Sequence, residues 1–178
     1  LYAPDDAALD VLAFVLAGDK NGRLYRRLVY EGQVAQQVVA YQQSGRLAGS
    51  FVIDVTPRPG QRPAALAAMV QEELRRVATE GITPRELARA QNSIRAGFLD
   101  RLASVREKAD LLNGYNYLAG TPDYVRQDAA RYDAVGADDV RRVAAEYLAR
   151  PKVVLTVVPQ GKRELALTAD TPALKVTK

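Results

Sequence analysis

Residues 22–56 read GRLYRRLVYEGQVAQQVVAYQQSGRLAGSFVIDVT, and the apolar residues change their spacing within this stretch. Leu24 and Leu28 lie one helical turn apart, which predicts a short helix that ends at Gly32. Beyond Gly32 the apolar residues alternate imperfectly with polar ones, and turn residues interrupt the alternation at positions 44–45. The pattern predicts a short helix followed by an antiparallel β-hairpin.

Helical spacing of apolar residues recurs on both sides of this hairpin. Asp5 or Asp6 is placed to cap a helix over residues 6–17, and Gly18 is placed to end that helix in a left-handed turn. Further helices are expected over residues 63–80, from residue 84, after residue 104, over 122–132 and over 138–148. We therefore expect most of the chain to be helical.

The clearest local signal is the sequence from Thr83 to Glu86. Thr83 is a preferred N-cap residue, Pro84 suits the first helical position, and Glu86 completes a capping box three residues after the cap. This combination predicts that a helix begins at Pro84.

The apolar, β-branched residues Val153 to Val158 predict a central strand. Taken with the hairpin and the helices, they give an α+β fold, an antiparallel sheet with helices packed on one face. We expect one domain over residues 1–159 and a linker or tail over 160–178, because that tail contains Pro172 and several lysines.

The composition is that of an ordinary globular domain, with 178 residues, 48% hydrophobic and 26% charged. The 25 Lys and Arg residues are interleaved with 21 Asp and Glu, which argues against a nucleic-acid partner. No apolar run is long enough to span a membrane.

The absence of both histidine and cysteine removes the commonest zinc ligands and general bases. We interpret the acidic pairs Glu72-Glu73 and Asp138-Asp139 as solvated or capping charges, because adjacent residues point apart on a helix.

Several segments, in order along the chain, resemble those of the insulinase-type (pitrilysin-like, inverzincin) zinc metallopeptidases. The stretch from Gly22 to Ala35 is similar to that family's "SRLYxxLvyexqiA" segment, and residues 83–90 are similar to its "TxxELxxA" helix start. Residues 108–113, 120–124 and 137–148 add weaker similarity. The resemblance covers residues 5–159 and implies the metal-free second domain of one repeat half, the peptidase inactive domain, with the family's half-domain roll.

In that family a preceding domain holds zinc through His-x-x-Glu-His and a downstream Glu, and this motif is absent here. The resemblance therefore implies no catalytic, cofactor-binding or metal-binding residue in this chain, which alone would not be an enzyme, and a zinc metalloendopeptidase as its parent protein. It implies a non-catalytic domain that forms part of the chamber that binds peptide substrates. The expected partners are the zinc-bearing domain, the partner half and the peptide. The alternative is a structural or assembly module of a non-peptidase relative.

The resemblance also indicates two candidate residues for the substrate chamber, Tyr30 and Gln36. The half of these peptidases that lacks zinc uses an Arg and, seven residues later, a Tyr to hold substrate, and the matching positions here are Val29 and Gln36. A small shift in register would let Arg27 or Tyr30 take these roles. Because Val29 and Gln36 differ from the Arg and Tyr of the half that lacks zinc, we expect this segment to come from the zinc-bearing half. The resemblance suggests a bacterial, exported parent protein, for example one in the periplasm, whereas the sequence itself leaves the compartment open.

Overall fold

The structure is a computed structural model that describes residues 2–45, 47–148, 150 and 152–167. Helices make up most of the chain, and a β-hairpin interrupts them between residues 35 and 57. The elements are α1 (Asp6–Ala17), η1 (Tyr25–Glu31), β1 (Ala35–Gln43), β2 (Ser50–Pro57), α2 (Pro63–Glu80), α3 (Pro84–Ala103), α4 (Val105–Ala119), α5 (Val125–Asp133), α6 (Ala137–Tyr147) and η2 (Arg163–Leu165).

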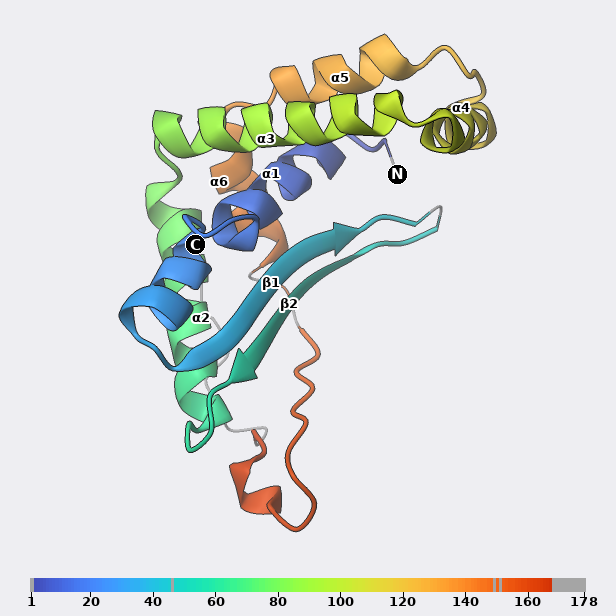
Figure 1. The fold of residues 1–178 in the computed structure, drawn as a ribbon. Helices are drawn as coiled ribbons and strands as arrows, with labels where there is room; N and C mark the ends of the chain where they lie inside the picture. Colours follow the sequence, from blue (N-terminus) through green and yellow to red (C-terminus); the bar gives the residue numbers. More distant parts are fainter. Residues whose placement is uncertain (1, 46, 149, 151, 168–178) are drawn as a thin grey trace.

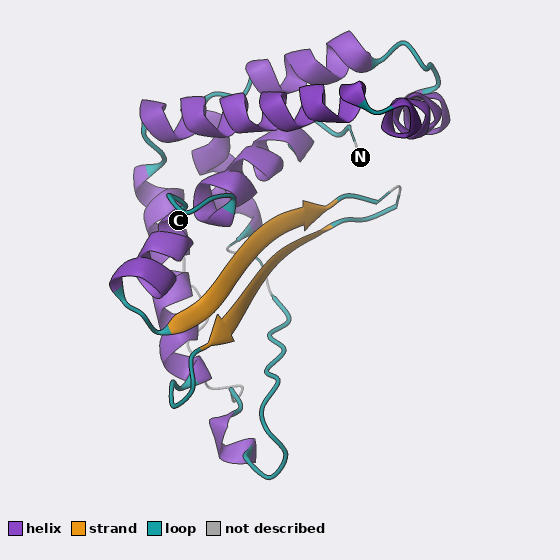
Figure 2. Ribbon diagram, in the orientation of Figure 1, coloured by secondary structure: helices purple, strands orange, loops and turns teal. Residues whose placement is uncertain are grey.

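The helices form layers above one face of the hairpin (Figure 1). Helices α3 and α5 run side by side in the outer layer, and α1 and α6 lie between them and the strands. Helix α2 packs along α6 and contacts β2. Figure 2 shows the separation of the helical part from the two strands. The α+β class with helices on one face of an antiparallel sheet is therefore confirmed.

The register of the hairpin determines which side chains face the helices. Strand β1 pairs antiparallel with β2, with Val38 opposite Val55 and Ala40 opposite Ile53. These residues belong to the core or pack against it, whereas Val39 on the opposite face is 36% exposed. The core lies between this inner face and α1, α2 and α6. Its fully enclosed residues include Val11, Leu12, Val15, Leu16, Leu24, Leu28, Val77, Val140 and Val143.

The helices expected from the sequence are present, and side-chain caps explain where α3, α4 and α6 begin. The Thr83 hydroxyl accepts a hydrogen bond from the Glu86 N–H at 3.2 Å, while the Glu86 carboxylate accepts from the Thr83 N–H at 2.8 Å. This is the predicted capping box. Ser104 caps α4 in the same way, accepting from the Glu107 N–H at 3.3 Å. Within the described ranges, no helix is both long and apolar enough to cross a membrane.

The expectation of a left-handed turn at Gly18 is wrong, because this residue keeps helical angles with φ −70°. A β-carbon at Gly18 would lie 2.3 Å from the ring of Phe14, so the position requires glycine for close packing. Asp5 precedes α1, but its side chain caps no backbone N–H. Its carboxylate instead accepts hydrogen bonds from Arg142 at 2.7 Å and Tyr147 at 2.8 Å.

The predicted central strand at Val153 to Val158 is also wrong. Residues 152–159 form neither helix nor strand, and Val153, Leu155 and Val157 are 97%, 84% and 87% exposed. The apolar pattern is suited to a sheet, but the described residues supply no neighbouring strand. The division between a domain at 1–159 and a tail at 160–178 stays a prediction, and residues 168–178 of that tail lie outside the described residues.

Candidate functional site

Both residues predicted to face a substrate lie at one corner of the molecule, where η1 leads into β1 (Figure 1). Tyr30, near the end of η1, is 74% exposed, and Gln36, at the start of β1, is also exposed. The two elements pack against each other. We refer to residues 25–37 as the η1–β1 corner.

Helix η1 is a π-helix, wider than the short helix predicted from the sequence. The Gly32 N–H donates to the Arg27 carbonyl at 3.1 Å, five residues back, where an α-helix would bond four residues back. Gln33 then adopts φ +50°, a left-handed conformation that is uncommon for residues other than glycine. Short π-helices and left-handed residues recur at functional sites, where surrounding contacts hold them in place.

A β-bulge places Gln36 at the surface. Ala35 pairs with Pro57 and Gln37 with Thr56, so Gln36 is an extra residue with no opposite partner. Arg58 fixes this end of the hairpin, because its N–H donates to the Val34 carbonyl at 2.9 Å and its Nε to the Ala35 carbonyl at 3.2 Å. The bulge turns Ala35 into the core and leaves Gln36 in solvent.

Beneath the corner lies an ionic cluster, defined here as Arg23, Arg27, Glu73 and Glu86. The Arg23 guanidinium binds both carboxylate oxygens of Glu86, at 2.7 and 2.8 Å, and its Nη2 donates to the Gly81 carbonyl at 3.1 Å. Arg27 binds Glu73 at 3.2 Å. These contacts join the corner to α2 and α3, and they fix the end of η1 relative to two long helices.

The pKa of Glu86 reflects its contacts within this cluster. Burial alone would raise its pKa, but hydrogen bonds from Arg23 and Thr83 outweigh burial and lower the pKa to about 2. Glu73 is only 6% exposed, which corrects its interpretation as a solvated charge. The interpretation holds for Glu72, which pairs with Arg75 at the surface, and for Asp139, which caps α6 at the Gly136 N–H. The cluster partners are 46 and 63 residues apart, and no local pattern in the sequence indicates them.

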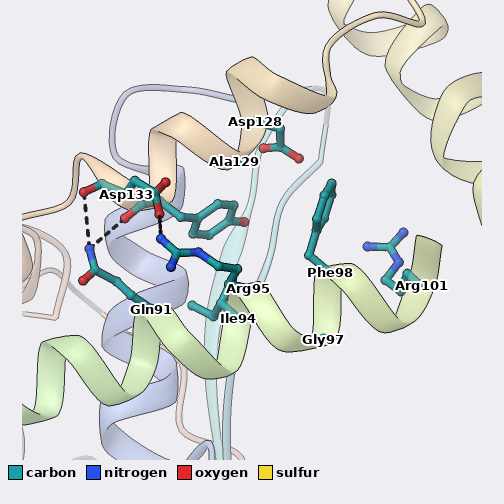
Figure 3. Close-up of a pocket in the computed structure, with 10 residues that line it drawn as sticks. Gln91, Ile94, Arg95, Gly97, Phe98, Arg101, Asp128, Ala129 and Asp133 are labelled. Atoms are coloured by element: carbon teal, nitrogen blue, oxygen red, sulfur yellow. Dashed lines mark hydrogen bonds and ion pairs between the residues drawn. The ribbon is translucent and has the colours of Figure 1, made fainter. Parts of the chain in front are cut away.

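A recess of about 300 Å³ lies between α3 and α5 (Figure 3). Phe98 and Ile94 provide apolar walls, and Arg95 closes one side through a 2.6 Å ion pair with Asp133. Gln91 binds the carbonyls of Tyr132 and Val135 at 3.0 and 3.2 Å. Because these polar groups bind each other, we regard the recess as a helix-packing gap.

Behind the recess, the Tyr132 hydroxyl donates to Asp10 at 2.7 Å. Burial raises the pKa of Asp10 to about 6, against the opposing effect of this hydrogen bond. On α4, the hydroxyl of the buried Tyr115 donates to Asp128 at 2.6 Å, while Tyr117, two residues later, is exposed. Tyr115 is therefore a packing residue.

The residues present do not fit a zinc ion. The sequence has no histidine or cysteine, and the described residues contain no group of three His, Cys, Asp or Glu side chains that could hold a metal. The exposed side chains of Tyr30 and Gln36 offer a phenol and an amide, which can hydrogen-bond to a peptide.

No curated protein matches this chain. Among solved structures, a protease from Helicobacter pylori superposes with a TM-score of 0.74 at 24% identity, covering 82% of this chain and 35% of that chain. The inactive peptidase domain of a candidate zinc protease from Bordetella parapertussis gives 0.72 at 22% identity, covering 82% and 79%. A peptidase M16 inactive domain from Pseudomonas fluorescens gives 0.68 at 20% identity, covering 82% and 35%.

These similarities show a shared fold, and the chain spans about a third of the Helicobacter pylori and Pseudomonas fluorescens chains. The sequence family described as "Peptidase M16 inactive domain" matches residues 2–94, just over half of the chain. That range contains the η1–β1 corner, the hairpin and the ionic cluster. The chain therefore belongs to the M16 peptidase inactive-domain family, as the resemblance to insulinase-type peptidases predicted.

Proposed function

We propose that this chain is a non-catalytic wall of a peptide-binding chamber in a zinc metallopeptidase, and that zinc and the hydrolytic step belong to another domain of the parent protein. The observation that carries the proposal is the η1–β1 corner. It presents Tyr30 and Gln36 to solvent on backbone held by the ionic cluster and by Arg58. An exposed aromatic side chain on a rigid support is typical of a binding surface.

The corner is suited to hold an extended peptide without much sequence preference. Tyr30 offers an aromatic face and a hydroxyl, and Gln36 offers an amide that can both donate to and accept from a peptide backbone. The inactive domain would contribute binding and orientation, while a zinc ion elsewhere would supply the Lewis acid and activate water.

The first test compares peptide hydrolysis by this chain with hydrolysis by a longer chain that includes the zinc-bearing domain, each with and without added zinc. We expect activity only in the longer, zinc-loaded chain. Activity of the short chain alone that a chelator abolishes would refute the proposal. Absence of activity from both would favour an assembly module, or show that the partner half is also required.

The second test changes the corner within the longer chain. Tyr30→Ala and Gln36→Ala should raise KM severalfold and leave kcat within about twofold, because both residues bind substrate away from the metal. Tyr117→Ala and Gln43→Ala are matched controls, since Tyr117 is an exposed tyrosine on α4 and Gln43 is exposed at the far end of β1. Unchanged KM in both corner variants would remove Tyr30 and Gln36 from the chamber.

A further inference from the structure

Asp6, at the start of α1, holds the end of β1 against the helices. One oxygen of its carboxylate accepts hydrogen bonds from the Gln42 side-chain amide at 2.8 Å and from the Ser44 hydroxyl. The other oxygen accepts from Arg131 of α5 at 3.3 Å. Asp6 is only 5% exposed. We refer to Gln42 and Ser44 as the hairpin end, which lies below the start of α1 (Figure 1).

The guanidinium of Arg131 is divided between two carboxylates. Besides its bond to Asp6, it binds Asp128 through Nη2 at 2.5 Å and through Nε at 3.2 Å. Both carboxylates belong to residues that are less than a tenth exposed. The rings of Tyr2 and Tyr132 lie 4.9 and 5.5 Å from the guanidinium carbon. Arg131 is therefore enclosed, and two buried acids compete for its charge.

Asp10 places a third carboxyl group beside these two. It follows Asp6 by four residues, so the two side chains share one face of α1. Its hydrogen bond comes from the hydroxyl of Tyr132, a neutral donor, at 2.7 Å. Burial raises the pKa of Asp10 to about 6; Asp6 and Asp128 add to this rise, while Tyr132 and Arg131 oppose it. Asp10 therefore gains its charge as the pH rises through 6.

The other elements that contact α1 are β1, α3 and α6. Strand β1 contributes the uncharged Gln42 at this position. The charged groups that α3 and α6 bring to this layer are engaged with other partners or line the recess beside Asp128: Arg95 binds Asp133 at 2.6 Å, Arg142 binds Asp5 at 2.7 Å, Tyr147 binds Asp5 at 2.8 Å, and Arg101 lines the recess. The charge balance around Asp10 is thus governed by Asp6, Asp128 and Arg131.

We propose that the charge on Asp10 controls the contact between the hairpin end and α1, which is closed when Asp10 is protonated and opens when Asp10 is ionised. Like charges one helical turn apart repel, and a charged Asp10 competes with Asp6 for Arg131. A buried carboxylate that loses part of its cationic partner is stabilised by contact with water. Moving the half-buried Gln42 and Ser44 aside opens a path from Asp6 to solvent.

The opening is local, because it involves one end of the hairpin. The η1–β1 corner lies at the other end of β1, where Arg58 and the ionic cluster hold the backbone. That end should keep its structure while the hairpin end opens. The pH response therefore does not depend on the chamber proposed above.

The test measures amide hydrogen exchange by NMR in the complete 178-residue chain at pH 5 and pH 7.5. Protection factors are compared, because they remove the intrinsic effect of pH on the exchange rate. We expect the protection of the hydrogen-bonded amides within residues 41–43 to fall at least fivefold at the higher pH, relative to those within residues 37–39 of the same strand. An equal fall at both ends of β1 would assign the effect to the stability of the whole domain. That result, or no fall at residues 41–43, would overturn the proposal.

Asp10→Asn tests the titrating group. The asparagine is uncharged at both pH values and keeps an acceptor for the Tyr132 hydroxyl, so protection within residues 41–43 should change less than twofold between them. Asp138→Asn is the matched control, since the Asp138 side chain is 94% exposed, and it should show the wild-type fall. A fall in Asp10→Asn as large as that in the wild type would overturn the proposal.

Gln42→Ala tests the connection to the strand. Without the amide that binds Asp6, protection within residues 41–43 should be low at both pH values and differ less than twofold between them. Gln43→Ala is the control, because Gln43 is the adjacent, exposed residue on the opposite face of β1, and it should respond as the wild type does. A wild-type fall in Gln42→Ala would show that Asp6 does not hold the strand through this amide, and would overturn the proposal.

Discussion

Glu86 and Asp10 are carboxyl groups withdrawn from solvent in two different parts of the molecule, and their pKa values shift in opposite directions. Hydrogen bonds from Arg23 and Thr83 outweigh burial at Glu86 and give a pKa of about 2. At Asp10 burial dominates, the one strong hydrogen bond comes from the neutral Tyr132, and the pKa is about 6. A cationic partner, rather than burial alone, decides whether such a carboxyl stays ionised.

The two environments also suggest different purposes. The charged cluster around Glu86 supports the proposed binding corner, where a fixed backbone is required. Asp10 joins α1 to α5 inside the helical layer, where its carboxyl group accepts a hydrogen bond from the Tyr132 phenol. The following predictions test this contrast, from the largest expected effect to the smallest.

Removing the cation should have the largest effect. Arg23→Ala leaves Glu86 and Glu73 without their shared partner, and we expect a loss of about 2–4 kcal/mol in the free energy of unfolding. Urea denaturation at neutral pH measures this loss. Arg26→Ala is the control, because Arg26 and its partner Glu31 are both more than half exposed and their ion pair should contribute less than about 1 kcal/mol. Equal losses in the two variants would contradict the contrast.

Removing the negative charge of Asp10 should have the opposite effect and raise the free energy of unfolding. Since the folded pKa of about 6 lies above the ordinary value of 3.8, the folded state holds this proton more tightly than the unfolded state. The stability due to that proton is complete below pH 3.8 and is lost as the pH rises through 6. Asp10→Asn should therefore stabilise the protein by about 1–2 kcal/mol at pH 8, after allowance for solvent screening, and this gain should vanish toward pH 3.5.

Denaturation midpoints of wild type and Asp10→Asn across this pH range provide the measurement. Asp138→Asn, at a side chain that is 94% exposed, should change stability by less than about 0.5 kcal/mol at every pH. A destabilised Asp10→Asn at pH 8 would contradict the contrast, because it would show that the hydrogen bond from Tyr132 outweighs the cost of burying the Asp10 charge.

The smallest effect is expected at the cap of α3. Thr83→Ala removes the hydroxyl that accepts from the Glu86 N–H and should cost about 1 kcal/mol. It should also raise the pKa of Glu86, since the same hydroxyl donates to that carboxylate at 2.9 Å. Carboxyl titration by NMR would record this change. The stability that Glu86 contributes is present above pH 4.5 and is lost as the pH falls toward 2, and in the variant this loss should be smaller and should be complete at a higher pH.

Local signals in the sequence predicted the helices, the hairpin and the capping box, because each depends on residues a few positions apart. Residues 153–158 have a stronger strand pattern than β1, yet β1 is paired and they are not, since a strand also needs a neighbour. The imperfect alternation in β1 has a structural reason. Ala35 and Val38 are both buried although they are three positions apart, because the bulge at Gln36 changes which face the chain presents.

The candidate site was predictable only in part. Tyr30 and Gln36 came from the family resemblance, and both are exposed at the same corner. Their binding of a substrate stays a prediction. Arg23 and Glu73 were missed, because ion pairs across 50 to 63 residues follow from the packing of helices and from no local spacing.

Helix η1 and strand β1, which form the η1–β1 corner, each contain one residue more than a regular helix or strand would have there. The π-helix has a wider turn than an α-helix, and the bulge adds Gln36 to the strand. The orientation of Tyr30 therefore depends on chain length. Deleting one residue of η1 would rotate the following residues by about 100° around the helix axis. Such a deletion should move Tyr30 more than any single substitution in the corner, so insertions and deletions, rather than substitutions, are the changes to which this surface is most sensitive.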